Sequence, residues 1–307
     1  MTDAARYVLV VGHARRADTV VAARRVIAAL SAAGLSAVLP AEDDEHGAVL
    51  DGAGPLLTLG VDVQVDELEL AVVLGGDGTI LRAAELVRDG TAPILGINMG
   101  HVGFLAEIEP DVLDDAMRRV IACEYEVEER MALHVAVLDE AGTVAYETFA
   151  LNEATVEKAA RERMMEVVIE IDERPLSSFG CDGVVVSTPT GSTAYNFSAG
   201  GPVIWPSVEA IAVVPLSAHA LFARPLVVGP EASVAIEVLA RTDGTGILWC
   251  DGRRSHDLPP GARVVMRRSD VPVRLARLHP AAFGDRLVRK FRLPVTGWRG
   301  PATEGVS

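Results

Sequence analysis

The distribution of hydrophobic and polar residues divides the chain into two parts with different periodicities. In the first third, short apolar runs typical of buried strands occur at residues 7–11, 70–74 and 93–97. Between and after them, apolar residues recur every three or four positions, which predicts helices, with Thr19 as the N-cap of the first, at residues 19–34, 80–88 and 112–121. This alternation predicts parallel strands, with ligands bound beyond their carboxyl ends.

The second part of the chain is patterned for β-structure. From residue 131 to about residue 276 the helical period nearly vanishes. Strict alternation, typical of half-buried antiparallel strands, replaces it at residues 134–138, 166–172, 233–239 and 263–267. The dipeptide Asp251-Gly252 interrupts these runs as a turn. A basic, amphipathic tail follows at residues 285–298.

Composition narrows the possible functions. The 307 residues are 50% hydrophobic and carry a formal net charge of -15, which disfavours nucleic acids and anionic membrane surfaces as partners. No uncharged apolar run reaches the ~18 residues that a membrane helix needs. The three cysteines, Cys123, Cys181 and Cys250, are odd in number and widely spaced, which favours a reducing compartment. We therefore expect a cytoplasmic location.

The first candidate motif is Gly-Gly-Asp-Gly-Thr at residues 75–79, between a buried strand and a helix. Its glycines let backbone N–H groups approach an anion that the helix dipole also favours, which suits a phosphate. A carboxylate beside phosphates is repulsive unless it accepts a proton, binds a ligand hydroxyl or contacts a metal, so Asp77 is the candidate general base. The same five residues also suit a simple helix-capping turn, and the motif alone leaves both interpretations open.

Two further segments carry polar groups suited to a nucleotide. Residues 182–202 run from an apolar strand into a loop dense in hydroxyl residues and glycine, where Tyr195 offers a flat face for a base or ring. The alternative for this loop is a Ser/Thr-rich turn with a core tyrosine. Asn152 and Glu153 follow a predicted strand at residues 143–150 and suit adenine edges and ribose hydroxyls respectively. Taken alone, such an Asn-Glu pair is more often a solvated loop.

Four segments resemble the NAD kinase family in order and approximate spacing, over most of the chain: residues 75–79, 103–105, 151–153 and 182–202. The glycine-aspartate motif is shared with lipid kinases and phosphofructokinases, whereas residues 188–195 are much more particular to NAD kinases. The ending at residues 291–298 is similar to that of actinobacterial members. Lysine is present only as Lys158 and Lys290, outside the glycine motif, which disfavours a P-loop or protein-kinase mechanism.

The resemblance implies an α/β fold class with two domains. A Rossmann-like α/β phosphate-donor domain is expected over residues 1–126, with the segment 280–307 packing back on it. An all-β sandwich that binds NAD and mediates oligomerisation is expected over residues 127–279. The implied reaction moves the terminal phosphoryl group of ATP onto the 2′-hydroxyl of the adenosine ribose of NAD, giving NADP.

The resemblance also implies roles for individual residues. Asp77 would orient and deprotonate the acceptor hydroxyl. The phosphate donor would be bound by Gly75, Gly76, Gly78, Thr79 and Arg82. NAD would be bound by Asp77, Gly78, Phe104, Asn152, Glu153, Arg163, Asp182, Thr193, Ala194, Tyr195, Asn196, Phe197, Ser198 and Arg253. The expected cofactor is a divalent metal, Mg2+ or Mn2+, whose ligands the sequence does not assign. The expected assembly is a homodimer or homotetramer, and the donor is ATP or inorganic polyphosphate.

Two other functions stay open at this point. A dinucleotide-binding regulator would use the same pocket without turnover, although the presence of Asp77 argues against it. A lipid or sugar kinase would phosphorylate diacylglycerol or fructose 6-phosphate instead of NAD. No Gly-x-Ser-x-Gly motif occurs, so hydrolase chemistry has no anchor here.

Overall fold

The computed structural model describes residues 5–13, 15–41, 50, 52–100, 103–106, 108, 112–160, 164–241, 245–278 and 282–295. The chain divides into two compact units, one formed by Met1–Glu128 with Arg274–Ser307 and the other by Glu129–Val273. Of the sequence predictions, Arg163 and residues 296–298 of the basic tail lie outside the described residues.

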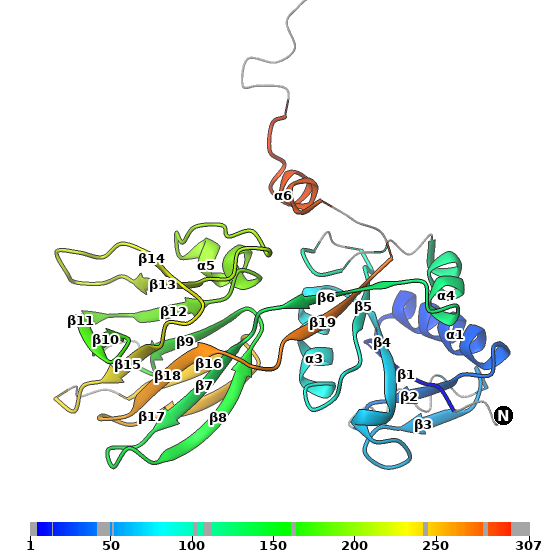
Figure 1. Ribbon diagram of the computed structural model, residues 1–307, viewed down its shortest axis with the longest axis horizontal. Helices are drawn as coiled ribbons and strands as arrows, with labels where there is room; N and C mark the ends of the chain where they lie inside the picture. Colours follow the sequence, from blue (N-terminus) through cyan, green and yellow to red (C-terminus); the bar gives the residue numbers. More distant parts are fainter. Residues whose placement is uncertain are drawn as a thin grey trace, which may run out of the picture. The chain divides into compact units, whose positions relative to one another are not determined.

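A seven-stranded sheet forms the centre of the first unit, in the order β3-β2-β1-β4-β5-β19-β6 (Figure 1). Its strands are β1 (Tyr7–Val11), β2 (Ser36–Leu39), β3 (Leu56–Thr58), β4 (Leu68–Leu74), β5 (Ile94–Ile97), β6 (Glu126–Arg130) and β19 (Val273–Arg277). The pairs from β3 across to β19 are all parallel. The chain runs outward from β1 to β3 and then returns to β4 and β5, so strand order reverses between β1 and β4. In open α/β sheets, ligands bind beyond the strand ends at such a reversal.

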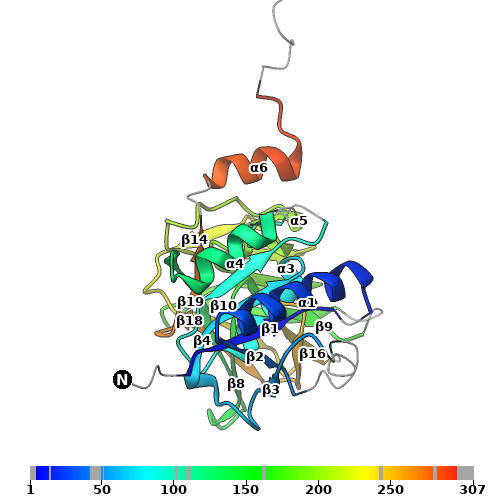
Figure 2. The same ribbon diagram turned by 90° about the vertical axis from the view of Figure 1, so that its right-hand side faces the viewer.

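Helices cover both faces of this sheet. The helices of the unit are α1 (Ala17–Ala32), α3 (Asp77–Leu86), α4 (Leu113–Ile121) and α6 (Phe283–Phe291), with a 3-10 turn at Val65–Glu67. The helices α1 and α4 lie side by side and share one hydrophobic core with the sheet (Figure 2). The helix α3 covers the opposite face (Figure 1). The predicted parallel α/β arrangement is confirmed.

The structure corrects three details of the sequence predictions. The helix α1 begins at Ala17 with Arg16 as its N-cap residue, whereas Thr19 lies inside the helix and is 2% exposed. The helix α3 begins at Asp77, three residues before the predicted start, so Asp77 belongs to its first turn. The chain returns to the first unit from Arg274, earlier than residue 280, because β19 pairs with β5.

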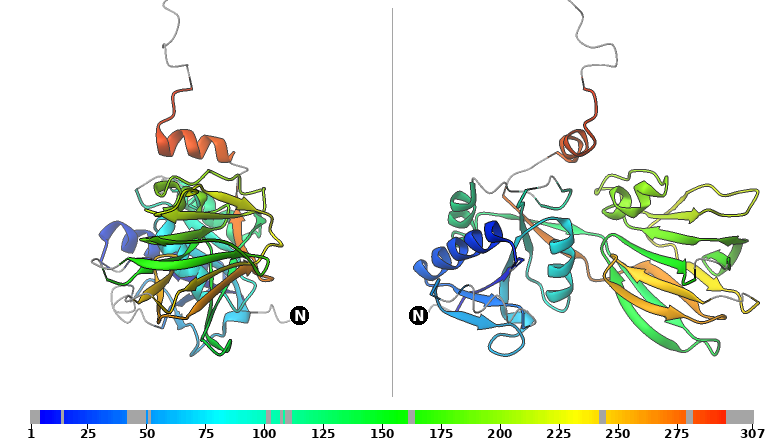
Figure 3. Two further views of the ribbon diagram at one scale, coloured as in Figure 1. Left: turned by 90° about the vertical axis from the view of Figure 1, so that its left-hand side faces the viewer. Right: turned by 180° about the vertical axis from the view of Figure 1, so that it is seen from behind.

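The second unit is a sandwich of two antiparallel six-stranded sheets (Figure 3). The first has the order β11-β10-β15-β18-β7-β8, and its strands in chain order are β7 (Leu133–Leu138), β8 (Val144–Ala150), β10 (Met165–Ile171), β11 (Arg174–Cys181), β15 (Val234–Val238) and β18 (Arg263–Arg268). The second has the order β14-β13-β12-β9-β16-β17, with strands β9 (Glu153–Lys158), β12 (Gly183–Ser187), β13 (Ile211–Leu216), β14 (Leu226–Val228), β16 (Gly246–Cys250) and β17 (Arg254–Leu258). Apolar side chains of both sheets form one core, which accounts for the period-two pattern in the sequence.

A short helical insertion follows β12. It consists of a 3-10 turn at Gly191–Thr193 and the one-turn helix α5 (Tyr195–Ser198). This insertion carries the hydroxyl-rich segment that the sequence singles out. Within the described part of the chain, no helix combines the length and apolar character needed to cross a membrane.

Candidate active site

The glycine loop joins the buried end of β4 to the start of α3, at the reversal of strand order. The Gly75 N–H donates to the Ile97 carbonyl oxygen at 2.9 Å, which ties the loop to β5. A Cβ atom at Gly75 would lie 2.3 Å from the Thr79 Oγ1 atom, so only glycine allows this close approach. At Gly76 and Gly78, by contrast, a Cβ atom would meet nothing within 4 Å. The start of α3 therefore presents open backbone with the geometry and dipole that favour a phosphate.

Asp77 is held in place through both oxygens of its carboxylate. The Phe104 N–H donates to Oδ2 and the Leu105 N–H donates to Oδ1, each at 3.0 Å. A Cβ atom at Gly103 would lie only 2.3 Å from Oδ1, so this segment approaches Asp77 closely because residue 103 is glycine. The residue is half-buried. Each carboxylate oxygen has a second lone pair, which leaves Asp77 able to accept a further hydrogen bond from a ligand hydroxyl.

The other predicted residues of the first unit lie near this loop along the chain. Thr79 and Arg82 follow Asp77 on α3, and both are half-buried. The Phe104 side chain is 7% exposed, and its ring lies 5.8 Å from the rings of Phe283 and Phe291 in α6. Phe104 therefore presents its backbone N–H to Asp77 while its ring packs against the C-terminal helix. Its predicted contact with NAD stays a prediction.

In the second unit, Asn152 lies in the turn between β8 and β9, and Glu153 is the first residue of β9; the two residues are 9% and 7% exposed. Asp251 fixes this turn, since its carboxylate accepts hydrogen bonds from the Leu151 N–H at 3.0 Å and from the Asn152 N–H at 2.7 Å. The Asp251 side chain is 1% exposed and forms a 2.7 Å ion pair with Arg254. The Asn152-Glu153 turn is consequently a rigid, buried element and not a solvated loop.

Glu153 is an unusual carboxyl group. Burial, together with the neighbouring Asp251 carboxylate, raises the pKa of Glu153 from 4.5 to about 8, although the Tyr195 N–H partly opposes this shift. Among the described residues, no group forms a hydrogen bond with its buried Oε2 atom. Near neutral pH the side chain is therefore largely protonated and can both donate and accept hydrogen bonds.

The hydroxyl-rich segment packs directly against this turn. The Thr188 N–H donates to the Asn152 carbonyl oxygen at 2.9 Å, and the Thr188 hydroxyl donates to the Leu151 carbonyl oxygen at 2.5 Å. The Tyr195 N–H reaches the Glu153 carboxyl group, and the Tyr195 ring remains 39% exposed. The structure thus brings Asn152, Glu153 and Tyr195 together.

The remaining predicted residues of this unit differ in what they can offer a ligand. Asp182 carries a carboxylate 2.5 Å from the Lys158 Nζ atom, and the hydrogen bonds from Lys158 and Ser217 lower its pKa. Asn196 is fully buried, and its Nδ2 atom donates to the Ser192 and Pro202 carbonyl oxygens at 3.2 and 3.0 Å, so it supports the loop from inside. The residues that are half-buried or exposed are Thr193, Ala194, Phe197, Ser198 and Arg253.

Sequence reasoning missed Asp251 and Arg254. The dipeptide Asp251-Gly252 reads as an ordinary turn, and the structure confirms a turn, with Asp251 at a φ of 55°. The second role, anchoring the connection between β8 and β9 that lies 99 positions earlier in the chain, depends on which strands pair, and β9 pairs with β16 directly before this turn. An aspartate in a tight turn directly after the apolar strand β16 is the one local signal that could have indicated it.

Comparisons with known proteins identify the family and the fold of this chain. The family model described as ATP-NAD kinase N-terminal domain matches residues 56–125, and the model described as ATP-NAD kinase C-terminal domain matches residues 151–278. Among solved structures, an NAD kinase from Archaeoglobus fulgidus in complex with ATP is similar with a TM-score of 0.70 and 26% identity, covering 93% of this chain and 98% of that chain. Yeast NADH kinase complexed with NADH has the same fold, with a TM-score of 0.86 and 22% identity over 96% of this chain and 90% of that chain.

Curated relatives match over nearly their whole length. The NAD kinase of Leifsonia xyli subsp. xyli is 63% identical over 303 residues, which cover 97% of this chain and 98% of that protein. The NAD kinase of Thermobifida fusca is 56% identical over 306 residues, which cover 97% of this chain and 93% of that protein. With both family models matched and identities of this size, the chain belongs to the NAD kinase family.

Proposed function

We propose that this chain transfers the terminal phosphoryl group of ATP to the 2′-hydroxyl of the adenosine ribose of NAD, giving NADP, with Asp77 as the general base. The observation that carries the proposal is the Asp77 carboxylate, fixed by two backbone N–H groups directly beside the open glycine positions of the α3 start. A base must be held within hydrogen-bond reach of the proton it removes, and this arrangement removes the rotational freedom of the carboxylate.

The phosphate donor is assigned to the glycine loop. Backbone N–H groups at the start of α3 bind the phosphates, the hydroxyl of Thr79 adds a donor, and the guanidinium of Arg82 neutralises charge one helical turn further on. Neither lysine belongs to this loop, because Lys158 lies on β9 and Lys290 on α6. The charge that develops in the transition state is therefore assigned to N–H dipoles and arginine, and a metal ion bound with ATP would supply further neutralisation of phosphate charge.

The second unit is assigned to NAD. Asn152 provides an amide, Glu153 provides a largely protonated carboxyl group, and Tyr195 provides an exposed aromatic face. These groups match the polar edges, ribose hydroxyls and ring faces of a dinucleotide. Asp182, Thr193, Ala194, Phe197, Ser198 and Arg253 are proposed as further contacts, whereas the buried Asn196 supports the loop.

A divalent cation fits the donor site if ATP phosphates supply most of its ligands. The described residues contain no group of three or more His, Cys, Asp or Glu side chains that could hold a metal ion. Mg2+ commonly binds through one or two carboxylates together with substrate phosphates, and Asp77 supplies one carboxylate at the glycine loop. The metal, Mg2+ or Mn2+, would thus arrive with ATP and neutralise phosphate charge.

We further propose a homodimer or homotetramer in the cytoplasm. The second unit exposes large apolar side chains, with exposed fractions of 111% at Leu221, 58% at Phe222 and 49% at Trp205. Such side chains favour burial against a partner subunit.

All three cysteines are free, which suits a reducing compartment. Light scattering during gel filtration tests the assembly. Replacing ATP by inorganic polyphosphate in the assay tests the second donor.

The decisive assay incubates the purified protein with NAD, ATP and Mg2+ and couples any NADP to an NADP-specific dehydrogenase. We expect NADP to form, and we expect the Asp77→Asn variant to keep nucleotide binding while kcat falls by about 100-fold or more. Binding without NADP would instead identify a regulator. Phosphorylation of diacylglycerol or fructose 6-phosphate in place of NAD would identify another kinase class. Full activity of Asp77→Asn would reject Asp77 as the base.

A further inference from the structure

The dipeptide Phe104-Leu105 is hydrogen-bonded on both of its sides. Its two N–H groups hold the two oxygens of Asp77. Its two carbonyl oxygens accept hydrogen bonds from arginine side chains of the C-terminal part of the chain. The Arg286 Nη1 atom donates to the Phe104 oxygen at 2.5 Å, and the Arg277 Nη1 atom donates to the Leu105 oxygen at 3.0 Å.

We propose that Arg286 and Arg277 are positioning residues for the phosphoryl transfer, because they fix the dipeptide that orients the Asp77 carboxylate. This inference rests on the proposed role of Asp77 as the base. Neither arginine belongs to the four segments that resemble the family. Arg277 lies 172 positions from Leu105 in the sequence, and Arg286 lies 182 positions from Phe104.

The geometry of the peptide bond makes Arg286 the more direct of the two. The Phe104 carbonyl and the Leu105 N–H belong to the same planar peptide group, so fixing the oxygen also fixes the direction of the N–H that points at Asp77 Oδ1. The three groups form a continuous chain from guanidinium to peptide to carboxylate, in which each hydrogen bond polarises the next. Arg277 holds the following carbonyl and so limits rotation of Leu105 from its other side.

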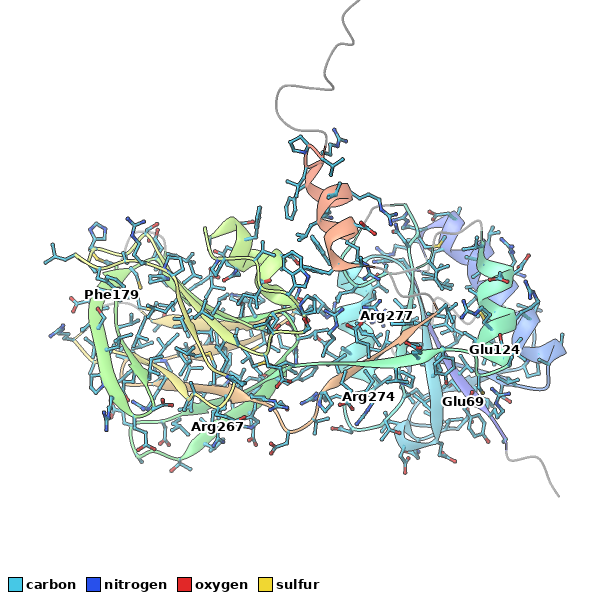
Figure 4. All side chains as sticks on the ribbon, turned by 45° about the horizontal axis from the view of Figure 1, so that its top comes forward. Glu69, Glu124, Phe179, Arg267, Arg274 and Arg277 are labelled. Carbon is cyan, nitrogen blue, oxygen red and sulfur yellow. The ribbon has the colours of Figure 1, made fainter. Side chains whose placement is uncertain are left out.

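Burial makes these contacts strong and specific. Arg286 is 8% exposed, Leu105 is 3% exposed, and the Arg277 side chain is 11% exposed. A buried carbonyl group that lost its donor would be unsatisfied, so the two guanidinium groups also keep this segment in one conformation. Arg277 is itself fixed by Glu128, whose Oε2 atom lies 2.7 Å from its Nε atom. Figure 4 labels Arg277 on β19, the strand next to β6, which carries Glu128.

A purely structural role for Arg286 would be to dock α6. The aromatic contacts speak against this as its main role, because the Phe104 ring lies 5.8 Å from both Phe283 and Phe291, near the two ends of α6. These ring contacts hold α6 to the Phe104 segment without the guanidinium. The helix also provides a matched control in Arg289, which is exposed and close to Arg286.

The experiment compares Arg286→Met, Arg286→Lys, Arg277→Met and the control Arg289→Met in the coupled NADP assay, with thermal unfolding measured for each. We expect Arg286→Met to lower kcat by about 10- to 100-fold while KM for ATP and NAD changes by less than about twofold. The reason is that the substitution disturbs the orientation of Asp77 and leaves the groups that bind the substrates unchanged. Arg277→Met should lower kcat less, Arg286→Lys should recover part of the loss, and Arg289→Met should match the unsubstituted protein.

A double-mutant cycle separates positioning from docking. If Arg286 acts through Asp77, adding Arg286→Met to Asp77→Asn should lower kcat by no more than about twofold further. A full multiplicative loss, or an unchanged kcat in a folded Arg286→Met protein, would overturn the inference. Should Arg286→Met fail to fold, Arg286→Lys enters the same cycle and is judged by the same two results. Full activity of Asp77→Asn would overturn the proposed base itself. A deficient Asp77→Asn with fully active arginine variants would overturn only the positioning role.

Discussion

The two units each present an acidic side chain to a proposed substrate, and they treat it in opposite ways. Asp77 is half-buried, and both of its oxygens accept backbone N–H groups. Glu153 is 7% exposed, has one oxygen without a hydrogen-bond partner among the described residues, and has its pKa raised to about 8 by burial and by Asp251. One group is thus prepared as an oriented acceptor and the other as a protonated donor, although both are simple carboxyl groups.

This contrast shows that the surroundings, more than the residue type, decide the chemistry of a carboxyl group. In the first unit, backbone N–H groups surround Asp77. Gly103 allows this backbone segment to approach the carboxylate closely, and two arginines from the C-terminal part of the chain hold the segment in place. In the second unit they are a buried carboxylate and its ion pair, Asp251 with Arg254. Each environment can be altered by substitutions that leave the acidic residue itself unchanged, and the following predictions use that possibility.

The largest effect is expected at Asp251. Asp251→Ala removes the acceptor of two buried N–H groups and leaves the Arg254 guanidinium without its ion pair, so the free energy of unfolding should fall by about 3 to 5 kcal/mol. Chemical denaturation measures this change. The exposed Asp257 on β17 provides the control, and Asp257→Ala should change the free energy of unfolding by less than about 0.5 kcal/mol. Equal effects of the two substitutions would mean that Asp251 does not anchor the Asn152-Glu153 turn.

The next effect concerns the orientation of Asp77. Gly103→Ala places a Cβ atom where only 2.3 Å separates it from the Asp77 Oδ1 atom, so the carboxylate or the segment must move. We expect kcat to fall by about 10- to 100-fold, since small misplacements of a catalytic group are costly. Gly229→Ala is the matched control because its Cβ atom would meet nothing within 4 Å. A fully active Gly103→Ala enzyme would contradict the importance of this close approach.

Substitutions of two glycines in the motif at residues 75–79 should distinguish an effect on stability from an effect on binding of the phosphate donor. Gly75→Ala forces a contact with Thr79 and should lower the free energy of unfolding by about 1 to 3 kcal/mol. Gly78→Ala meets open space in α3, so stability should be kept or rise by up to about 1 kcal/mol. The methyl group would nevertheless obstruct a bound phosphate, and KM for ATP should rise by about 10-fold. An unchanged KM in Gly78→Ala would place the phosphates elsewhere.

The last prediction concerns the pH dependence of stability. Because the folded-state pKa of Glu153 lies near 8, above its ordinary value of 4.5, its contribution is fully present below pH 4.5 and is lost as the pH rises towards 8. Glu153→Gln should remove this fall, which amounts to at most about 1.4 kcal/mol per pH unit for one proton. Denaturation between pH 4.5 and 8, with the exposed Glu140→Gln as control, measures the difference. Identical pH profiles for Glu153→Gln and the unsubstituted protein would show that Glu153 ionises normally.

The sequence predicted the architecture well because the dominant signals are local. The apolar run at residues 70–74 of β4 favours a buried strand, and the alternation along β10 favours a sheet with one buried face. Local preference failed at the helix starts. Thr19 is a favourable N-cap residue in isolation, but in the fold its methyl group packs against Gly12 at the end of β1, and the helix begins two residues earlier.

The sequence indicated the motifs of the candidate site, but it did not indicate the residues that hold those motifs in place. Asp77 stands out because a carboxylate is unusual in a glycine-rich turn at the end of a buried strand, whereas Asn152 and Glu153 gain their meaning only from the flanking motifs. Asp251, Arg277 and Arg286 do not stand out, because an aspartate in a turn, an arginine at the end of a strand and an arginine in a basic tail are all common surface residues. Their importance comes from contacts that span 99 to 182 positions, which only the folded chain reveals.

The most direct test of the account is a crystal structure of the protein with NAD bound. We expect one oxygen of the Asp77 carboxylate to lie within hydrogen-bond distance, about 2.6 to 3.2 Å, of the 2′-hydroxyl of the adenosine ribose. The N–H groups of Phe104 and Leu105 should still hold the carboxylate in that complex. A 2′-hydroxyl that lies beyond reach of Asp77 and beside a different proton acceptor would contradict the central claim.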